Sequence, residues 1–141
     1  MEQEIETFLR YIICLKGAVM GQNRSSMEER VATGMQFGVL NFLAEHDSVT
    51  SGEVATHLSL SPSSATQLVE RLVRDDLVER QADQEDRRVV HLKLTDNGRA
   101  ERERVYGFIR ERVGRLLGGL TTEERTELIR LHKKIYDTIN S

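Results

Sequence analysis

The hydrophobic pattern changes its period twice in the middle of the chain, and this change constrains the fold more than any other feature. From Ala65 to Val73 apolar residues recur at helical spacing, whereas Leu77–Gln81 and Val90–Leu94 have a period of two. Helical spacing returns after Thr95. A period near 3.6 indicates an amphipathic helix, and a period of two indicates a strand with one buried face. The pattern therefore predicts a helix, a two-stranded hairpin and another helix, in that order.

Another short helix is expected just before this segment. Thr50 is followed by Glu53 in the capping-box arrangement that begins a helix. After a short turn, Ser61 can cap the next helix, and Pro62 suits its first turn, where no backbone N–H is needed. Two helices joined by a short turn and followed by a hairpin form a winged helix-turn-helix.

The rest of the chain is predicted to be helical, which gives a mainly α fold of about six helices with one small β-hairpin wing. Further capping boxes are expected at Thr33 and Thr121, a loop at 21–29, and a helix end at Gly118-Gly119. The chain has 141 residues, the length of a single domain. Besides the two helices already described, helices are predicted over residues 3–21, 33–46, 95–117 and 121–139.

The charge distribution limits the partners that the protein can bind. Its formal net charge is −3, from 20 basic and 23 acidic side chains, and no third of the chain is strongly basic. This composition argues against a protein that simply coats nucleic acid. Any contact with DNA must therefore depend on where a few arginines point.

Composition also excludes several classes of function. A single cysteine, Cys14, rules out an internal disulfide framework and a cysteine-based zinc site. The histidines stand singly, and there is no nucleophile–base pair or glycine-rich phosphate loop, so we expect no metal, no cofactor and no enzymatic activity. No apolar run has the length of a membrane helix, and the N-terminus lacks the pattern of a signal peptide, so a cytoplasmic protein is expected.

The strongest functional candidate is the turn of the hairpin, Asp86-Arg87-Arg88. The second helix of a helix-turn-helix lies in the major groove, and a hairpin beside it would reach the adjacent minor groove, whose negative potential attracts arginine. The alternative for Arg87 and Arg88 is a solvated turn with salt bridges to Asp83, Glu85 or Asp86. On the helix and its cap, the residues predicted to contact DNA are Ser61, Ser63, Ser64, Thr66, Gln67, Arg71 and Arg74.

Several short motifs are weak signals individually, but their order and spacing together are specific. They are Gln36-Phe37-Gly38-Val39-Leu40, Ser61, Thr66, Leu68-Val69-Glu70-Arg71-Leu72, Leu77-Val78-Glu79-Arg80, Asp86-Arg87-Arg88-Val89 and Leu92-Lys93-Leu94-Thr95-Asp96-Asn97-Gly98. In these motifs the sequence resembles the MarR family of bacterial transcription regulators. The resemblance covers residues 33–100 by motif and the flanking helices by length and pattern. One departure is Asp75-Asp76 before Leu77, where the family often has a glycine.

The resemblance implies a DNA-binding homodimer. The first and last two helices of each subunit intertwine, so residues 1–32 and 96–141 would form the dimerisation region and residues 33–95 the DNA-binding region. The resemblance also implies that Arg88 enters the minor groove and that Asp86 holds it, while the role of Arg87 stays open. The residues support a dimer independently, because three amphipathic helices outside the winged core need a surface to bury. Two recognition helices about 34–36 Å apart would read a palindromic operator.

The resemblance further implies a repressor that releases its operator when a small molecule binds between the dimer base and the winged part. Two alternatives remain at this stage. Cys14 could make the protein an oxidation sensor, although its apolar neighbours favour an inert thiol. The winged helix could also serve only for association with another protein. The residues predicted to line an effector pocket are Tyr11, Met20, Met35, Phe37 and Phe42.

Two glycines lie inside the predicted helix that follows the hairpin. Gly107 and Gly114 are seven residues apart, and each costs about 1 kcal/mol relative to alanine in a helix. Either the helix tolerates this cost, or the backbone of another helix approaches closely at these positions.

Overall fold

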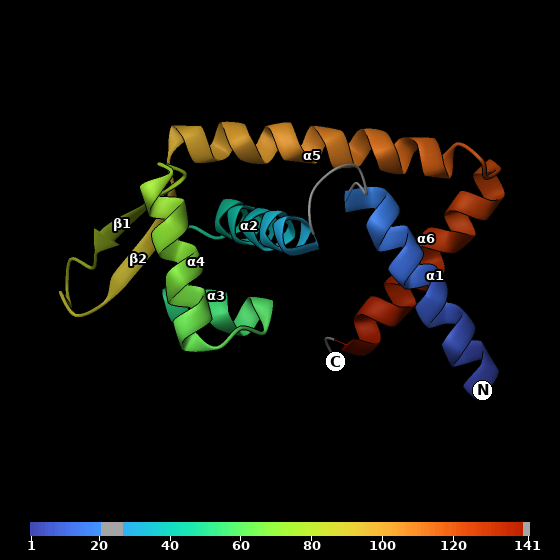
Figure 1. The fold of residues 1–141 in the computed structure, drawn as a ribbon, viewed down its shortest axis with the longest axis horizontal. Coiled ribbons are helices and arrows are strands. Elements are labelled where there is room, and N and C mark those ends of the chain that lie inside the picture. The colour runs from blue at the N-terminus through green and yellow to red at the C-terminus, as the bar shows by residue number, and fades with distance from the viewer. Residues whose placement is uncertain (21–26, 140–141) are drawn as a thin grey trace.

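The computed structural model describes residues 1–20 and 27–139. These residues form helices and one two-stranded antiparallel hairpin (Figure 1), which confirms the mainly α winged-helix architecture that the sequence predicts. The elements are α1 (Glu2–Met20), α2 (Met27–Glu45), α3 (Ser51–Leu58), α4 (Pro62–Arg74), β1 (Val78–Ala82), β2 (Val90–Leu94), α5 (Asp96–Leu117) and α6 (Thr122–Ile139).

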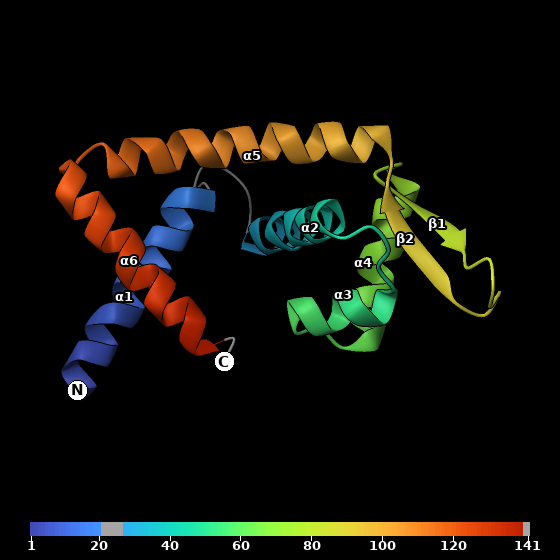
Figure 2. The same ribbon diagram turned by 180° about the vertical axis from the view of Figure 1, so that it is seen from behind.

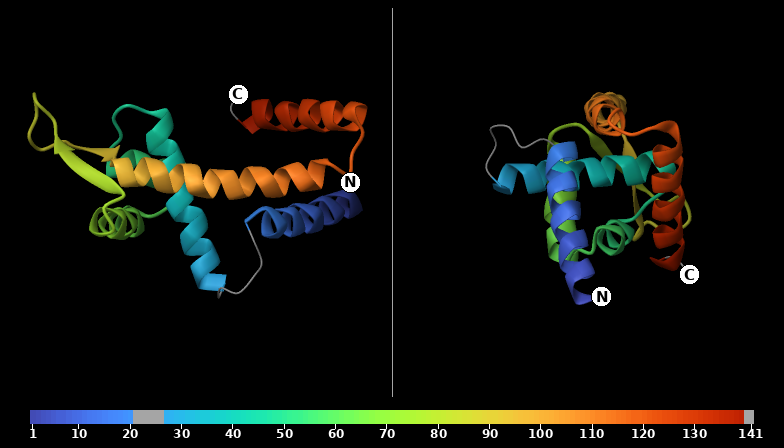
Figure 3. Two further views of the ribbon diagram at one scale, coloured as in Figure 1. Left: turned by 90° about the horizontal axis from the view of Figure 1, so that it is seen from above. Right: turned by 90° about the vertical axis from the view of Figure 1, so that its right-hand side faces the viewer.

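The long helix α5 joins two groups of elements. At one end α3, α4 and the hairpin form the winged part, and at the other end lie α1 and α6 (Figure 1). Seen from behind, α2 runs beneath α5 (Figure 2), and both α1 and α2 contact it. Although α1 and α6 cross in these views, from above they lie on opposite sides of α5 (Figure 3). The two terminal helices are therefore apart within one chain.

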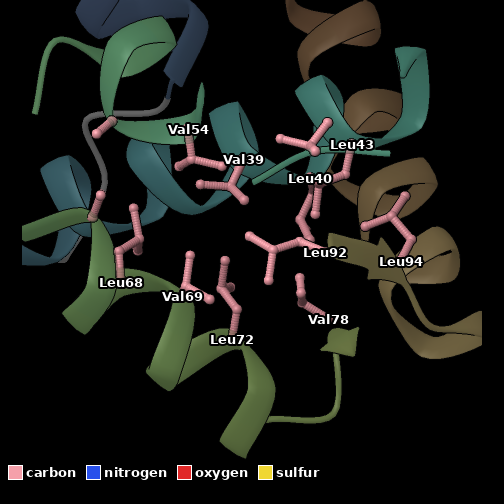
Figure 4. Packing of buried hydrophobic residues seen from close by; sticks show 13 residues of the cluster. Val39, Leu40, Leu43, Val54, Leu68, Val69, Leu72, Val78, Leu92 and Leu94 are labelled. Atoms are coloured by element: carbon pink, nitrogen blue, oxygen red, sulfur yellow. The ribbon is translucent and has the colours of Figure 1, made fainter. Parts of the chain in front are cut away.

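A hydrophobic core fills the winged part, where side chains from α2, α3, α4 and the hairpin meet (Figure 4). Leu40, Leu72 and Leu92 are almost fully buried there. The backbone N–H of Leu92 also donates to the carbonyl of Val49 at 2.6 Å, so the segment before α3 pairs with β2. This core packs α4 and the hairpin together. Its members are Val39, Leu40, Leu43, Val49, Val54, Ala55, Ala65, Leu68, Val69, Leu72, Val78, Leu92 and Leu94.

Reciprocal side-chain caps begin two helices where the sequence predicts them. Thr50 Oγ1 accepts a hydrogen bond from the backbone N–H of Glu53 at 3.2 Å, and Glu53 Oε2 accepts one from the N–H of Thr50 at 2.8 Å. The same pair of bonds joins Thr121 and Glu124, at 3.2 and 2.8 Å. Because these bonds satisfy free N–H groups of the first turn, they fix where α3 and α6 begin.

The start of α2 differs from the prediction. The helix begins at Met27, so Thr33 lies inside it and does not cap it, and residues 27–29 are helical. The upstream residues include methionine, glutamate, arginine and alanine, which favour helix and extend it beyond the local capping pattern. The remainder of the predicted loop, residues 21–26, lies outside the described residues.

The hairpin has the predicted pairing with small shifts at its ends. Val78 lies opposite Leu94, and Ala82 lies opposite Val90. Strand β1 begins one residue later than predicted, because Leu77 belongs to the turn that ends α4. Val90 was expected to share the buried face with Leu92 and Leu94, but its side chain is 40% exposed. It stands near the tip of the hairpin, beyond the reach of the core.

The exit from α4 explains why this position favours glycine. Asp76 has a φ of 56°, in the left-handed region that non-glycine residues rarely adopt. Its backbone N–H donates to the carbonyl of Val73 at 3.1 Å, and that of Leu77 donates to the carbonyl of Leu72 at 2.9 Å. This pair of bonds is the Schellman motif, which ends a helix and reverses the chain. Aspartate tolerates the left-handed region better than most side chains do, so the turn forms without glycine.

No other helix approaches Gly107 or Gly114 within the described part of the chain. A Cβ atom added at either position would meet nothing within 4 Å. The close approach considered above is therefore not made by the described residues of one chain.

Candidate nucleic-acid interface

A cluster of serines forms the start of α4. Ser61 Oγ accepts a hydrogen bond from the backbone N–H of Ser64 at 3.2 Å, which is the predicted helix cap. The same hydroxyl donates to Ser64 Oγ at 2.9 Å and lies 3.3 Å from Ser63 Oγ. All three residues are exposed. The short side chains leave the N-terminus of α4 open to close approach by a large surface.

The outer face of α4 carries longer polar side chains farther along the helix. Gln67, Arg71 and Arg74 are exposed, opposite the apolar stripe that packs into the core. At about 100° per residue, Ser63 and Ser64 belong to the same face. Thr66 lies to the side of it, and its hydroxyl donates to the carbonyl of Pro62 at 2.9 Å. Within the described residues neither Arg71 nor Arg74 makes an ion pair, so both guanidinium groups are available to a ligand.

The wing tip holds one arginine in a fixed position. Asp86 Oδ1 accepts from the backbone N–H of Arg88 at 3.0 Å and from its Nε at 3.1 Å, while Asp86 Oδ2 accepts from the terminal guanidinium nitrogen at 3.2 Å. The side chain of Arg88 is nevertheless 91% exposed. The Arg88 guanidinium holds the pKa of the Asp86 carboxyl below its usual range. The salt bridge of the alternative interpretation is thus present, but it presents Arg88 outward instead of hiding it.

Arg87 differs from Arg88. It is exposed, and no ion pair within the described residues engages it. The carboxylates of Asp83 and Asp86 are instead committed to other partners. The wing tip therefore presents one clamped arginine, Arg88, and one unclamped arginine, Arg87.

Asp83 was considered above only as a salt-bridge partner of the arginines, and His91 was given no role in the wing. Asp83 Oδ1 accepts from the backbone N–H groups of Glu85 and Asp86, at 2.8 and 3.0 Å, and Asp83 Oδ2 lies 2.7 Å from His91 Nε2. The hydrogen bond with His91, together with the two backbone bonds, lowers the pKa of Asp83 to about 2. An aspartate at the start of a polar turn is a recognisable signal for bonds to backbone groups two and three residues on. The contact with His91 crosses the hairpin and has no such local signal.

The residues predicted to line an effector pocket lie in different parts of the molecule. Phe42 packs against the winged core, and its ring stacks on that of His57 with centroids 4.0 Å apart. Tyr11 lies on α1, near the opposite end of the molecule, where it lines a shallow surface depression with other residues of that helix. Met35 is partly exposed and Phe37 half-buried, both on α2. The side chains of Met20 and Cys14 lie outside the described part of the structure.

The described residues bring together no other chemical site of the kinds considered above. Among them, no group of three or more histidine, cysteine, aspartate or glutamate side chains gathers as metal ligands would. None of the helices they form is long and apolar enough to cross a membrane.

Known proteins resemble this chain over most of its length. A model of the MarR family matches residues 33–89. The HTH-type transcriptional repressor MdtR of Bacillus subtilis (strain 168) is 34% identical over 110 residues, which cover 78% of this chain and 71% of that protein. A MarR family protein from Bacillus stearothermophilus has a TM-score of 0.78 at 25% identity, covering 99% of this chain and 95% of that one. BpsR of Bordetella bronchiseptica, solved to explain how 6-hydroxynicotinic acid regulates its DNA binding, has a TM-score of 0.70 at 26% identity, covering 94% and 98%.

The family similarity and the geometry agree. The matched segment spans the helix-turn-helix and most of the wing, where the exposed face of α4 and the clamped Arg88 lie. The relatives are transcriptional regulators, and the similarity to MdtR extends beyond the winged part. The chain belongs to the MarR family of transcriptional regulators.

Proposed function

We propose that the protein represses transcription as a homodimer that binds a palindromic operator and releases it when a small molecule binds. One observation supports the proposed contact with DNA. The exposed serine, glutamine and arginine side chains of α4 stand beside a wing whose Arg88 is clamped by Asp86 and points into solvent. Helix α4 and the hairpin pack on the same hydrophobic core, so their exposed side chains would meet adjacent grooves of one duplex together.

The contacts follow from the lengths of the side chains. Ser61, Ser63 and Ser64 let the start of α4 approach the floor of the major groove. Gln67 suits adenine, and Arg71 suits guanine or a phosphate, because these side chains match the hydrogen-bonding edges of those groups. Beside them on the helix, Thr66 and Arg74 would contact the phosphate backbone. On the wing, Arg87 would do the same, while Asp86 would orient Arg88 in the minor groove.

The dimer is supported by apolar surface that one chain leaves uncovered. No described residue of α6 is buried, and Leu131, Ile135 and Ile139 are 43%, 45% and 76% exposed. Helix α1 likewise exposes Ile5, Leu9 and Ile12. A second copy would cover these faces and set the spacing of the two recognition helices.

Regulation by a small molecule is proposed from similarity. The DNA binding of BpsR is regulated by 6-hydroxynicotinic acid, and this chain shares its fold at 26% identity. A ligand acts on DNA binding only if it prefers one spacing of the recognition helices over another. We propose that its pocket lies between the dimer base and the winged part. Tyr11, Met20, Met35, Phe37 and Phe42 could line it together only if both subunits contribute, because Tyr11 and Phe42 lie in different parts of one chain.

Footprinting of the purified protein on genomic DNA, followed by titration of the recovered fragment at several salt concentrations, tests this proposal. Arg88→Ala should weaken binding and reduce the slope of log K against log salt by about one. Arg115→Ala, at the far end of α5 and paired with Glu111, is the matched control and should leave the slope unchanged. A folded dimer that shifts no DNA at low salt would contradict DNA binding. An unchanged slope for Arg88→Ala would contradict the wing contact alone.

A further inference from the structure

We infer that Asp83 and His91 are positioning residues for DNA binding, because together they brace the wing loop that presents Arg88. This inference rests on the proposed contact between Arg88 and DNA. Neither side chain needs to touch DNA. Their role is to hold the backbone from which Asp86 and Arg88 project.

The first step is the bond network inside the loop. One oxygen of Asp83 accepts both the N–H of Glu85, at 2.8 Å, and the N–H of Asp86, at 3.0 Å. The backbone N–H of Asp83 donates to the carbonyl of Val89 at 2.9 Å, and the N–H of Val89 donates to the carbonyl of Asp86 at 3.0 Å. Backbone hydrogen bonds therefore join the two ends of the loop, and one oxygen of Asp83 binds the backbone N–H groups inside it.

The second step ties this carboxylate to the hairpin. Its other oxygen lies 2.7 Å from His91 Nε2 on β2. An ionised carboxylate only accepts, so His91 donates from Nε2. His91 Nδ1 is buried and has no hydrogen-bond partner among the described residues. The only hydrogen-bond partner of the imidazole among the described residues is therefore Asp83. The side chain of His91 is 23% exposed and that of Asp83 is 31% exposed, whereas that of Arg88 is 91% exposed.

The third step connects the brace to the arginine. Asp83 fixes the backbone N–H of Asp86, and the carboxylate of Asp86 in turn accepts the backbone N–H and the Nε of Arg88. Asp83 therefore fixes the backbone of the loop, and Asp86, three residues later, fixes the guanidinium of Arg88. Loss of Asp83 leaves Asp86 and Arg88 paired with each other but no longer held in one place relative to α4.

Whether removal of Asp83 strengthens or weakens DNA binding distinguishes a positioning role from an effect of its charge alone. Asp83 is an anion in a loop that would face phosphates. If charge were all that mattered, removing it would strengthen DNA binding at every salt concentration. If Asp83 positions Arg88, removing it weakens binding despite the gain in electrostatic attraction.

The test titrates four variants and the wild-type protein with the footprinted duplex at several salt concentrations. Asp83→Ala should weaken DNA binding and reduce the slope of log K against log salt, so that both approach the affinity and slope of Arg88→Ala. Asp83→Asn removes the same charge but keeps an oxygen that can accept both backbone N–H groups, while its amide nitrogen cannot accept from His91 Nε2, so it should bind more tightly than Asp83→Ala. The double variant Asp83→Ala/Arg88→Ala should bind no more weakly than Arg88→Ala alone, because the brace acts through that arginine and only the gain in electrostatic attraction remains.

Thermal unfolding of each variant shows whether the winged core remains folded, and the NMR signal of Arg88 Nε–H reports the loop without DNA. That signal should broaden or move toward its free-peptide position in Asp83→Ala and in His91→Ala. If Arg88→Ala weakens binding while Asp83→Ala binds as tightly as wild type, the brace is wrong and the wing contact stands. If Arg88→Ala has no effect, the proposed wing contact fails and the inference fails with it.

Discussion

Asn97 Nδ2 donates a hydrogen bond to Asp76 Oδ2 at 2.6 Å, which joins the first turn of α5 to the exit of the recognition helix. Thr95 adds two more bonds at this joint. Its hydroxyl donates to the carbonyl of Asp76 at 2.5 Å, and its backbone N–H donates to the carbonyl of Leu77 at 3.2 Å. This joint therefore fixes the start of α5 on the end of α4.

Asp76 should be sensitive to the kind of side chain that replaces it. Asp76→Ala should lower the free energy of unfolding by about 1–2 kcal/mol, since alanine is strained at a φ of 56° and cannot accept from Asn97. Asp76→Asn should be nearly neutral, because asparagine tolerates this backbone region and its amide oxygen still accepts. Urea unfolding of both variants measures the difference. Equal stabilities would mean that neither the backbone nor the contact matters at this turn.

Gly98 should tolerate no side chain. A Cβ atom there would overlap the carbonyl oxygen of Leu77, a backbone atom that cannot move aside. We expect Gly98→Ala to cost more than about 3 kcal/mol of stability, or to prevent folding. Gly52→Ala is the control, because its Cβ would meet only Thr50 Oγ1 at 3.8 Å and the helix would gain up to about 1 kcal/mol. A Gly98→Ala protein as stable as Gly52→Ala would contradict the close contact between α5 and the α4 exit.

The parts of the fold that depend on neighbouring residues could be predicted from the sequence. The caps at Thr50, Ser61 and Thr121 each join residues three apart, so the pattern and the structure agree. The contact of Arg88 with Asp86 spans only two residues and was expected from resemblance. The false cap at Thr33 shows the limit of such patterns, because a longer run of helix-forming residues overrides a local signal.

The parts that depend on distant residues could not be predicted in this way. The contact of His91 with Asp83 requires the register of the hairpin and the shape of its loop, neither of which a single sequence specifies. The joint between Asn97 and Asp76 requires the Schellman turn to bring two helices together. Both features involve residues that look like ordinary solvated polar groups until the chain is folded.

The carboxyl group of Asp83 should titrate well below its ordinary value. Its pKa is lowered from 3.8 to about 2, first by the hydrogen bond with His91 and then by the two backbone N–H groups. Because the native pKa lies below the unfolded one, the stabilisation is complete above pH 3.8 and is lost as the pH falls through about 2. Carboxyl NMR shifts should show Asp83 still mostly ionised at pH 3, and His91→Ala should raise its midpoint. A wild-type midpoint at the ordinary value would contradict the brace.

The dimer should depend on the apolar stripe of α6. Ile135 is 45% exposed in one chain and lies between Leu131 and Ile139, four residues away on either side. A glutamate at that position would bury a charge in the dimer, so Ile135→Glu should give monomers in analytical ultracentrifugation and lose binding to the palindromic fragment. Thr126 lies nine residues earlier, on the opposite face of the helix at about 100° per residue, so Thr126→Glu is the matched control. The winged core contains no residue of α6, and near-UV and thermal measurements should show it intact in both variants. An Ile135→Glu protein that remains a dimer and binds DNA normally would place the dimer interface elsewhere.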